Sequence, residues 1–235
     1  MSIDFTLTPE LEDLRLRVRT FVEEVVKPGE AKIGDPDEIE RDEYINILFG
    51  MRKAAQEAGI WLPHMPKEWG GMGLGHVELA MVQAEAAKAY YGPFVFNCQA
   101  PDEGNMHTLL HWATDEQKQK YLKPLCDGFA MSCFAMTEPE VAGSDPTLIR
   151  TTAVQDGDEW VINGHKWFIS NARRAKFAIR RGGVADALAS GPLPVPRALA
   201  NSRSIFPGLG SGRLALAAAG SLSQDRPRCC RVDGG

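Results

Sequence analysis

Two neighbouring stretches decide the fold, MSCFAMTEPEVAGSD at 131–145 and DEWVINGHKWFISN at 158–171. The first opens with the short apolar run SCFAMT. In the second, strand-like EWVI lies between Asp156-Gly157 and Asn163-Gly164. Asp-Gly and Asn-Gly pairs are strong signals for hairpin turns. The pattern therefore predicts an antiparallel β unit that begins near residue 131, with HKWFIS at 165–170 as its next strand.

The sequence before this β unit has helical periodicity. Thr8 is suited to cap a helix, Pro9 fits its first turn, and Glu10 complements the positive end of the helix dipole. Pro28-Gly29 is expected to end this helix. The residues that recur at helical spacing are Leu11, Leu14, Val18, Phe21, Val22 and Val25.

Further helices are predicted from Ile39 to Gly59 and from His76 to just before Gly92-Pro93. Another helix is expected around 106–113. Thr114 with Gln117 three residues later is a capping-box signature for a segment that ends near Pro124. Helices followed by a separate β unit predict an α+β fold, with an all-α domain at 5–127 and the β-domain at 131–179.

The tail at 180–235 has a different composition. It contains eight Arg, three Asp, no Lys and no Glu, and Phe206 is its only aromatic residue. Such sparse apolar content offsets little of the about 1 to 2 kcal/mol that each ordered residue costs, so we expect a low-complexity, disordered segment without further strands. Two explanations stay open for it, a basic tail that binds an acidic partner and a reading-frame change in a GC-rich gene, of which we favour the second.

Charge and cysteine content restrict the function classes. A net charge of −5 gives no basic footprint for nucleic acid. No apolar run reaches membrane-spanning length, and the N-terminus lacks the order of a signal peptide. The five cysteines have neither CxxC spacing nor an even number, so we expect buried thiols in a reducing compartment and a cytoplasmic location.

Two motifs have a functional and a structural interpretation. The glycine-rich segment 70–75 suggests a nucleotide loop, but it follows a proline-broken loop and has His76 where the dinucleotide fingerprint needs glycine. We interpret it as a turn that lets the next helix pack closely. His107 and His111 have the i, i+4 spacing of a metal pair, but no third ligand is evident, so no metal site is predicted.

The sequence at 131–171 resembles the acyl-CoA dehydrogenase family. The family pattern is a Thr-Glu-Pro-x-x-Gly-Ser-Asp strand and turn, followed by an Asn-Gly pair and an aromatic-Ile-Ser-Asn segment. Here three residues, 140–142, separate Pro139 from Gly143. PKEWGGMGLG (66–75), FNCQAPDEGNM (96–106) and TDEQKQKYLKPLCDG (114–128) also look like family segments. The resemblance covers about residues 5–179, and it implies a helical domain followed by a truncated middle β-domain.

The resemblance also implies FAD bound in an extended form across the β-domain. A flat, partly apolar ring needs an aromatic wall and a few polar groups held on rigid strands, and this segment can supply both. In the resemblance, Phe134, Met136 and Thr137 lie along the flavin ring, and Gly143 and Ser144 form the turn at the pyrophosphate. Phe168 packs against the flavin in place of the more usual Trp, and the Ser170 hydroxyl lies near the reactive N5.

The family oxidises an acyl-CoA to the 2-enoyl-CoA, with electron-transfer flavoprotein or a similar acceptor, and its members form homo-oligomers. A carboxylate removes the α-proton, and in the family it comes from a third, C-terminal helical domain. Nothing after residue 179 resembles that domain, so no catalytic residue is assigned, and Glu138, Glu140 and Asp145 are interpreted as turn and cap residues. Two classes stay open: a truncated dehydrogenase without turnover of its own, and a non-catalytic interaction protein that retains part of the flavin surface.

Overall fold

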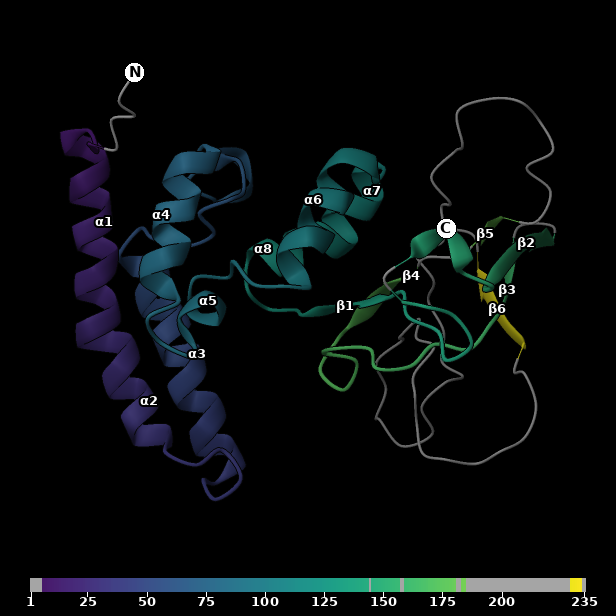
Figure 1. The fold of residues 1–235 in the computed structure, drawn as a ribbon, viewed down its shortest axis with the longest axis horizontal. Helices are drawn as coiled ribbons and strands as arrows, with labels where there is room; N and C mark the ends of the chain where they lie inside the picture. Colours follow the sequence, from purple (N-terminus) through teal and green to yellow (C-terminus); the bar gives the residue numbers. More distant parts are fainter. Residues whose placement is uncertain (1–5, 144, 157–158, 181–182, 185–228, 234–235) are drawn as a thin grey trace. The chain divides into compact units, whose positions relative to one another are not determined.

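The computed structural model describes residues 6–143, 145–156, 159–180, 183–184 and 229–233 (Figure 1). The chain divides into two compact units. The first contains the residues up to Glu103 together with Cys126–Gly128, and the second contains Gly104–Leu125 and the residues from Phe129 onward. Each unit is described by itself.

The first unit is helical, as the sequence predicts. Thr8 caps the first helix by accepting a hydrogen bond from the Leu11 amide at 3.4 Å. The elements are α1 (Pro9–Phe21), the π-helical segment η1 (Val22–Val26), α2 (Lys27–Ile33), α3 (Arg41–Glu57), the 3-10 turn η2 (Lys67–Trp69), α4 (His76–Ala86) and α5 (Gly92–Val95).

The core of the first unit collects the apolar faces that the helical spacing predicts. Val18 and Val26 from the first helical stretch, Ala55 from α3, and Val82 from α4 are fully buried. Arg52 lies on the same face of α3 and is also buried, with its guanidinium 4.7 Å from the Trp61 ring centre and 4.4 Å from that of Phe94. Burial lowers the Arg52 pKa to about 10.

The expected end of the first helix at Pro28-Gly29 is wrong, because the chain continues as α2 to Ile33. The reason lies in η1, where the Lys27 amide donates to the Val22 carbonyl five residues back. A wider turn accommodates a proline that lacks an N–H and whose ring would clash with the preceding turn. Pro124 follows the π-helical segment η3 (Lys118–Leu122) in the same way, so both prolines lie inside helical runs.

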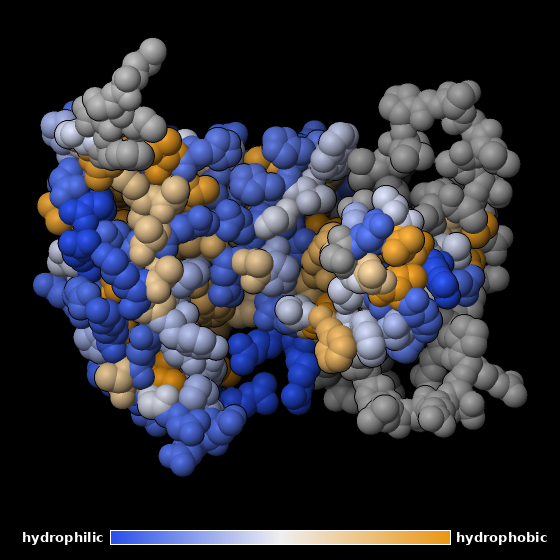
Figure 2. Space-filling model, viewed as in Figure 1, coloured by the Kyte–Doolittle hydropathy of each residue, from blue (hydrophilic) through white to orange (hydrophobic). Residues whose placement is uncertain are grey.

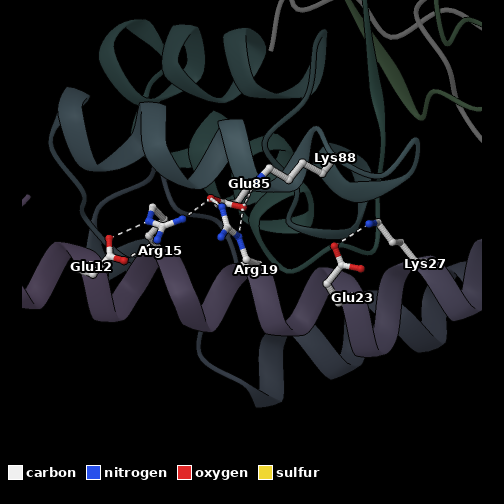
Figure 3. A network of polar contacts seen from close by, with 7 residues as sticks. All are labelled: Glu12, Arg15, Arg19, Glu23, Lys27, Glu85 and Lys88. Atoms are coloured by element: carbon white, nitrogen blue, oxygen red, sulfur yellow. Dashed lines mark hydrogen bonds and ion pairs between the residues drawn. The ribbon is translucent and has the colours of Figure 1, made fainter.

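A buried carboxylate joins α1 to α4 (Figure 3). The Glu85 side chain is 5% exposed, and it accepts hydrogen bonds from Arg15 at 3.0 Å, Arg19 at 2.9 Å and Lys88 at 2.5 Å. Burial alone would raise the Glu85 pKa, but these three cations lower it to about 2. Arg15 is held in turn by Glu12 on its own helix.

The glycine-rich segment forms a tight turn, which confirms the structural interpretation. It follows η2 directly, and Gly75 is the residue before α4. The Gly71 Cα lies so close to other backbone that an added Cβ would be 2.1 Å from the Met65 carbonyl oxygen. Among the residues that the structure describes, the first strand comes much later, at Ser132, so the segment does not follow a strand as a dinucleotide loop would.

The second unit begins with helices. Thr114 and Gln117 form the predicted capping box, in which the Gln117 amide donates to Thr114 Oγ1 and the Thr114 amide donates to Gln117 Oε1. Tyr121 packs against Phe177 of the β part with ring centres 5.0 Å apart. The elements are α6 (Asp102–Trp112), α7 (Asp115–Gln117), η3 and α8 (Lys123–Cys126), of which the ends of α6 and α8 belong to the first unit.

The strands form two small sheets. β1 (Ser132–Ala135) pairs in parallel with β4 (Phe177–Arg180), a strand that the sequence reasoning missed. β2 (Thr152–Asp156) and β3 (Glu159–Asn163) are antiparallel, with Asp156 opposite Glu159, as a hairpin between them predicts, and residues 157–158 lie outside the described residues. Cys133, Ala175 and Ala178 form a buried cluster behind β1.

The strand expected over HKWFIS is not formed, and Asn163-Gly164 ends β3 without starting a hairpin. Phe168 has φ 49° and Asn171 has φ 69°, so the chain leaves the extended region at both residues. A turn then follows over 170–174. Backbone in the left-handed region cannot continue a strand, whatever its apolar alternation.

Two short strands lie beyond residue 180, where none was expected. β5 (Gly183–Val184) pairs in parallel with β2, and β6 (Cys229–Asp233) pairs antiparallel with β3. β3 would otherwise present an open edge of unpaired N–H and C=O groups, and such edges accept a further strand readily. Residues 185–228 of the tail, including those expected to be disordered, lie outside the described residues.

In the part of the chain that the structure describes, no helix combines the length and apolar content needed to cross a bilayer. On the visible side of the helical unit, hydrophilic residues predominate, with apolar residues between them (Figure 2). Cys98, Cys126 and Cys133 are buried free thiols, as the sequence reasoning expected for these three.

Two glycine substitutions should have opposite effects on the first unit. Gly71→Ala places a methyl group against fixed backbone and should lower the free energy of unfolding by about 2 to 3 kcal/mol. Gly50→Ala, in the exposed interior of α3 with nothing within 4 Å of the new Cβ, should raise it by about 0.5 to 1 kcal/mol. Urea denaturation measures both, and equal effects would contradict this packing.

The Glu85 cluster should make the helical unit sensitive to acid. Because the folded pKa of about 2 lies below the ordinary glutamate pKa of 4.5, the stabilisation is complete above pH 4.5 and is lost as the pH falls toward 2. Glu85→Gln should lower the free energy of unfolding by about 2 to 3 kcal/mol at pH 7. It should also reduce the further loss of stability as the pH falls. Denaturation curves at pH 7 and pH 3 test this. The control is Glu57→Gln, at an exposed position of α3.

Candidate functional site

Most of the residues predicted to hold a flavin surround one short connection in the second unit. Phe134 lies in β1, opposite Ile179 of β4, and Met136 and Thr137 follow directly after that strand. Phe134, Met136 and Thr137 are each half-buried. A rigid strand therefore leads into the predicted flavin segment, which limits the freedom of the residues after it.

Thr137 is joined to Trp167 by two hydrogen bonds. The Thr137 hydroxyl donates to the Trp167 carbonyl at 2.6 Å, and the Trp167 amide donates to the Thr137 carbonyl at 3.2 Å. The segment after β1 and the segment 166–168 thus lie side by side, although the second segment is not a strand. Because the Thr137 hydroxyl donates its proton to the Trp167 carbonyl, its oxygen can still accept a hydrogen bond from a ligand N–H.

Gly143 lies against the same threonine. A Cβ built at residue 143 would be 2.9 Å from the Thr137 Cγ2 atom, so the absence of a side chain permits this approach. Ser144, the second residue of the predicted pyrophosphate turn, lies outside the described residues. Asp145 follows and accepts hydrogen bonds from the Thr147 amide at 2.9 Å and hydroxyl at 2.6 Å, which together lower its pKa.

Phe168 and Trp167 form an aromatic pair beside this connection. Their ring centres are 4.6 Å apart with a tilt of 44°. The Phe168 side chain is 80% exposed, and its backbone is in the left-handed region. An exposed aromatic ring held in an unusual backbone conformation is typical of a ligand-contacting position.

Ser170 is exposed at the start of the turn over 170–174. Among the side chains that the structure describes, no hydrogen bond joins it to Thr137. The structure thus brings together Thr137, Gly143 and the Trp167–Phe168 pair. Ser170 lies two residues beyond Phe168, and its role stays a prediction.

The sequence reasoning missed a buried ion pair under the site. Lys166 Nζ donates to Glu138 Oε1 at 2.8 Å and to the Met136 carbonyl at 2.7 Å, and both side chains are at most 1% exposed. Glu138 also accepts from the Arg150 amide at 2.7 Å, the Thr151 amide at 2.9 Å and the Thr151 hydroxyl. Burial alone would raise the Glu138 pKa, but these hydrogen bonds lower it to about 2.

Asp145 caps the turn that follows it, as its interpretation as a turn residue expected. Glu138 differs from that interpretation, because its partners are the distant amides of residues 150 and 151 and the buried Lys166. Glu140 is exposed and lies 3.7 Å from His165 Nδ1. A signal for the Lys166 contact was available in the sequence. Within HKWFIS, Lys166 is a charged residue in a mostly apolar stretch, and Glu138 is the only acid inside the run from Met131 to Pro139.

These residues suit a flavin. Such a ring system needs an aromatic surface, which Phe168 and Trp167 supply, and polar groups on fixed backbone, which the Thr137 connection supplies. Gly143 lets this turn lie directly against the Thr137 side chain, where an added Cβ would be too close. The described residues therefore combine the chemical groups that one flat, polar-edged cofactor requires.

Comparison with known proteins gives the class. The model of the acyl-CoA dehydrogenase N-terminal domain matches residues 8–129, and that of the acyl-CoA dehydrogenase middle domain matches residues 133–181. The chain belongs to the acyl-CoA dehydrogenase family.

Individual relatives agree with this assignment. Human acyl-CoA dehydrogenase family member 11 is 36% identical over 180 residues, which is 74% of this chain and 23% of the relative. A structure assigned to an acyl-CoA dehydrogenase from Mycobacterium abscessus has 34% identity and a TM-score of 0.70, over 79% of this chain and 48% of the other.

A glutaryl-CoA dehydrogenase from Mycobacterium smegmatis, solved in complex with FADH2, has 26% identity and a TM-score of 0.55. That match covers 77% of this chain and 44% of the other. The chain thus spans less than half the length of these relatives.

Removing the buried acid should destabilise the second unit. Glu138→Ala leaves the Lys166 ammonium buried without its anion and should cost about 3 to 5 kcal/mol in the free energy of unfolding. Glu140→Ala makes the same change at an exposed position nearby and should cost less than about 0.5 kcal/mol. Urea denaturation at pH 7 compares the two, and similar losses would contradict the burial of this pair.

Proposed function

We propose that this chain is the flavin-holding front part of an acyl-CoA dehydrogenase, an oxidoreductase that desaturates an acyl-CoA thioester between its α and β carbons. The family assignment supports the class. The observation that carries the proposal is the grouping of Thr137, Gly143 and the Trp167–Phe168 pair around one connection. FAD is the cofactor proposed, as the FADH2 complex of the glutaryl-CoA dehydrogenase supports.

In this proposal, each residue contacts a different part of FAD. Phe134, Met136 and Thr137 lie along the ring, and the Thr137 hydroxyl, which donates to Trp167, accepts from the pyrimidine edge. Phe168 covers one face of the ring and excludes water from it. Gly143 and Ser144 leave room for the pyrophosphate, and the Ser170 hydroxyl donates near N5. Bound FAD supplies the hydride acceptor for the substrate β-carbon.

The described acids near this site are unsuited to remove the α-proton. Glu138 is saturated with donors, and its pKa of about 2 makes it a very weak base. Asp145 is held by Thr147, and Glu140 lies in an exposed turn. We therefore propose that the base comes from outside residues 1–179, and that this chain alone does not turn over acyl-CoA.

The remaining proposals follow from the family. The electron acceptor would be electron-transfer flavoprotein or a similar protein, and the process would belong to fatty acid β-oxidation. We propose a cytoplasmic location and no direct role for nucleic acid or membranes. Homo-oligomerisation is a family property that this chain would share only if its assembly surfaces lie within it.

A flavin titration tests the proposal with two matched variants. Phe168→Ala and Phe129→Ala remove equally exposed rings, at 80% and 83%, from the same unit. Loss of the Phe168 ring should weaken FAD binding about tenfold, or about 1.4 kcal/mol, whereas loss of Phe129 should leave it unchanged. FAD fluorescence on titration with protein gives both affinities.

The same sample tests the chemistry. An acyl-CoA added to the FAD-loaded chain should not bleach the flavin absorbance and should not reduce an electron-accepting dye. Bleaching by an acyl-CoA would contradict the proposal that the base lies elsewhere. Absence of any FAD binding, or equal binding by the two phenylalanine variants, would favour the interaction protein that retains only part of the flavin surface.

A further inference from the structure

The Lys166–Glu138 pair joins three backbone segments that are distant in sequence. Lys166 Nζ contacts the Met136 carbonyl and the Glu138 carboxylate, which fixes 166 against 136–138. The same carboxylate accepts from the amides of residues 150 and 151, at the start of β2. One buried charge pair therefore sets the relative positions of all three segments.

Such a pair is a poor device for stability alone. Removing two charges from water is expensive, and well-packed apolar residues of the same size often stabilise a fold as well or better. A buried pair with all its hydrogen bonds made does restrict the geometry of the groups that it joins. Here Lys166 binds the Met136 carbonyl and the Glu138 carboxylate, which lie two residues apart in one segment.

The restricted geometry reaches the flavin-contacting residues directly. Thr137 lies between the two groups that Lys166 binds, Met136 and Glu138. Trp167 follows Lys166 and forms two hydrogen bonds with Thr137, one donated by each residue, and Phe168 comes next with its left-handed backbone. A shift of Lys166 would therefore move the Thr137 hydroxyl and the Phe168 ring relative to each other.

We propose that Lys166 and Glu138 are positioning residues for the flavin site, which hold the Thr137 hydroxyl and the Phe168 ring in the arrangement that the cofactor requires. The inference rests on the proposed function, since it names the support for that same site. Neither residue touches the cofactor in this scheme. Both act through the backbone of residues 136–138 and 166–168.

The test removes both charges and keeps the shape. In the full chain, Lys166→Met with Glu138→Gln replaces the ion pair by neutral side chains of similar size, so no lone charge stays buried. Lys176→Met is the matched control, because Lys176 is exposed and its side chain belongs to the same unit. Hydrogen–deuterium exchange of 165–171, with α6 as the internal reference, and FAD titration are the two measurements.

The double variant should unfold cooperatively. Its exchange over 165–171 should rise at least tenfold while α6 keeps its protection, and its FAD affinity should fall at least tenfold. Lys176→Met should change neither quantity more than twofold. A folded double variant that matches Lys176→Met in both measurements would overturn the inference, because the pair would then contribute to stability alone.

Two further outcomes also decide the question. If the parent chain binds no FAD, the proposed function fails, and the exchange of 165–171 alone decides whether the pair holds this segment. If the double variant does not fold, Glu138→Asp alone replaces it, since aspartate keeps the anion beside Lys166 while its shorter side chain weakens the contacts with Lys166 and with the amides of 150 and 151. Exchange over 165–171 at least threefold faster in that variant supports the inference, and unchanged exchange overturns it.

Discussion

Burial of the Glu138 charge constrains the second unit more than any other contact. An ionised carboxylate away from water is tolerated only with close donors on all sides, and here one ammonium, two amides and a hydroxyl provide them. None of these donors lies in the segment that contains Glu138, because they come from residues 150, 151 and 166. The connection after β1, the start of β2 and the segment before Phe168 must therefore fold together.

The first unit uses a buried carboxylate differently. Glu85 is surrounded by three cations whose side chains are 22% to 43% exposed, so these side chains remain partly hydrated and can adjust. Lys166 is fully buried and has no such freedom. The Glu85 cluster links α1 to α4 while its cationic side chains can still adjust, whereas the Glu138 pair holds its neighbours in one arrangement.

The sequence predicted what depends on local chemistry and missed what depends on tertiary contacts. The Thr8 cap, the Thr114–Gln117 box and the antiparallel pairing on either side of Asp156-Gly157 follow from neighbouring residues, and the structure has all three. The prediction that the helix ends at Pro28 was wrong because a five-residue π-helical segment precedes the proline and allows the helix to continue. No local sequence signal marks that segment. HKWFIS has strand-like alternation, but its partner is a single connection near Thr137 and not a strand.

The candidate site shows the same division. Thr137, Gly143 and Phe168 were identified because a motif resemblance names them, and their grouping could then be examined in space. No motif names Lys166, and its place in a mostly apolar stretch does not identify its partner, which only the fold brings beside it. Contacts across 28 residues of sequence are set by packing, so a single chain read residue by residue does not reveal them.

Each of the two units contains a proline inside a helical run, and both accommodate it in the same way. Pro28 and Pro124 each follow a π-helical segment of five residues, and in both the residue before the proline donates its amide five residues back. A proline in a regular helix would lose one hydrogen bond and clash with the preceding turn, at a cost of about 3 kcal/mol. The wider turn removes the clash, so these prolines can remain within helices that the rest of each unit packs against.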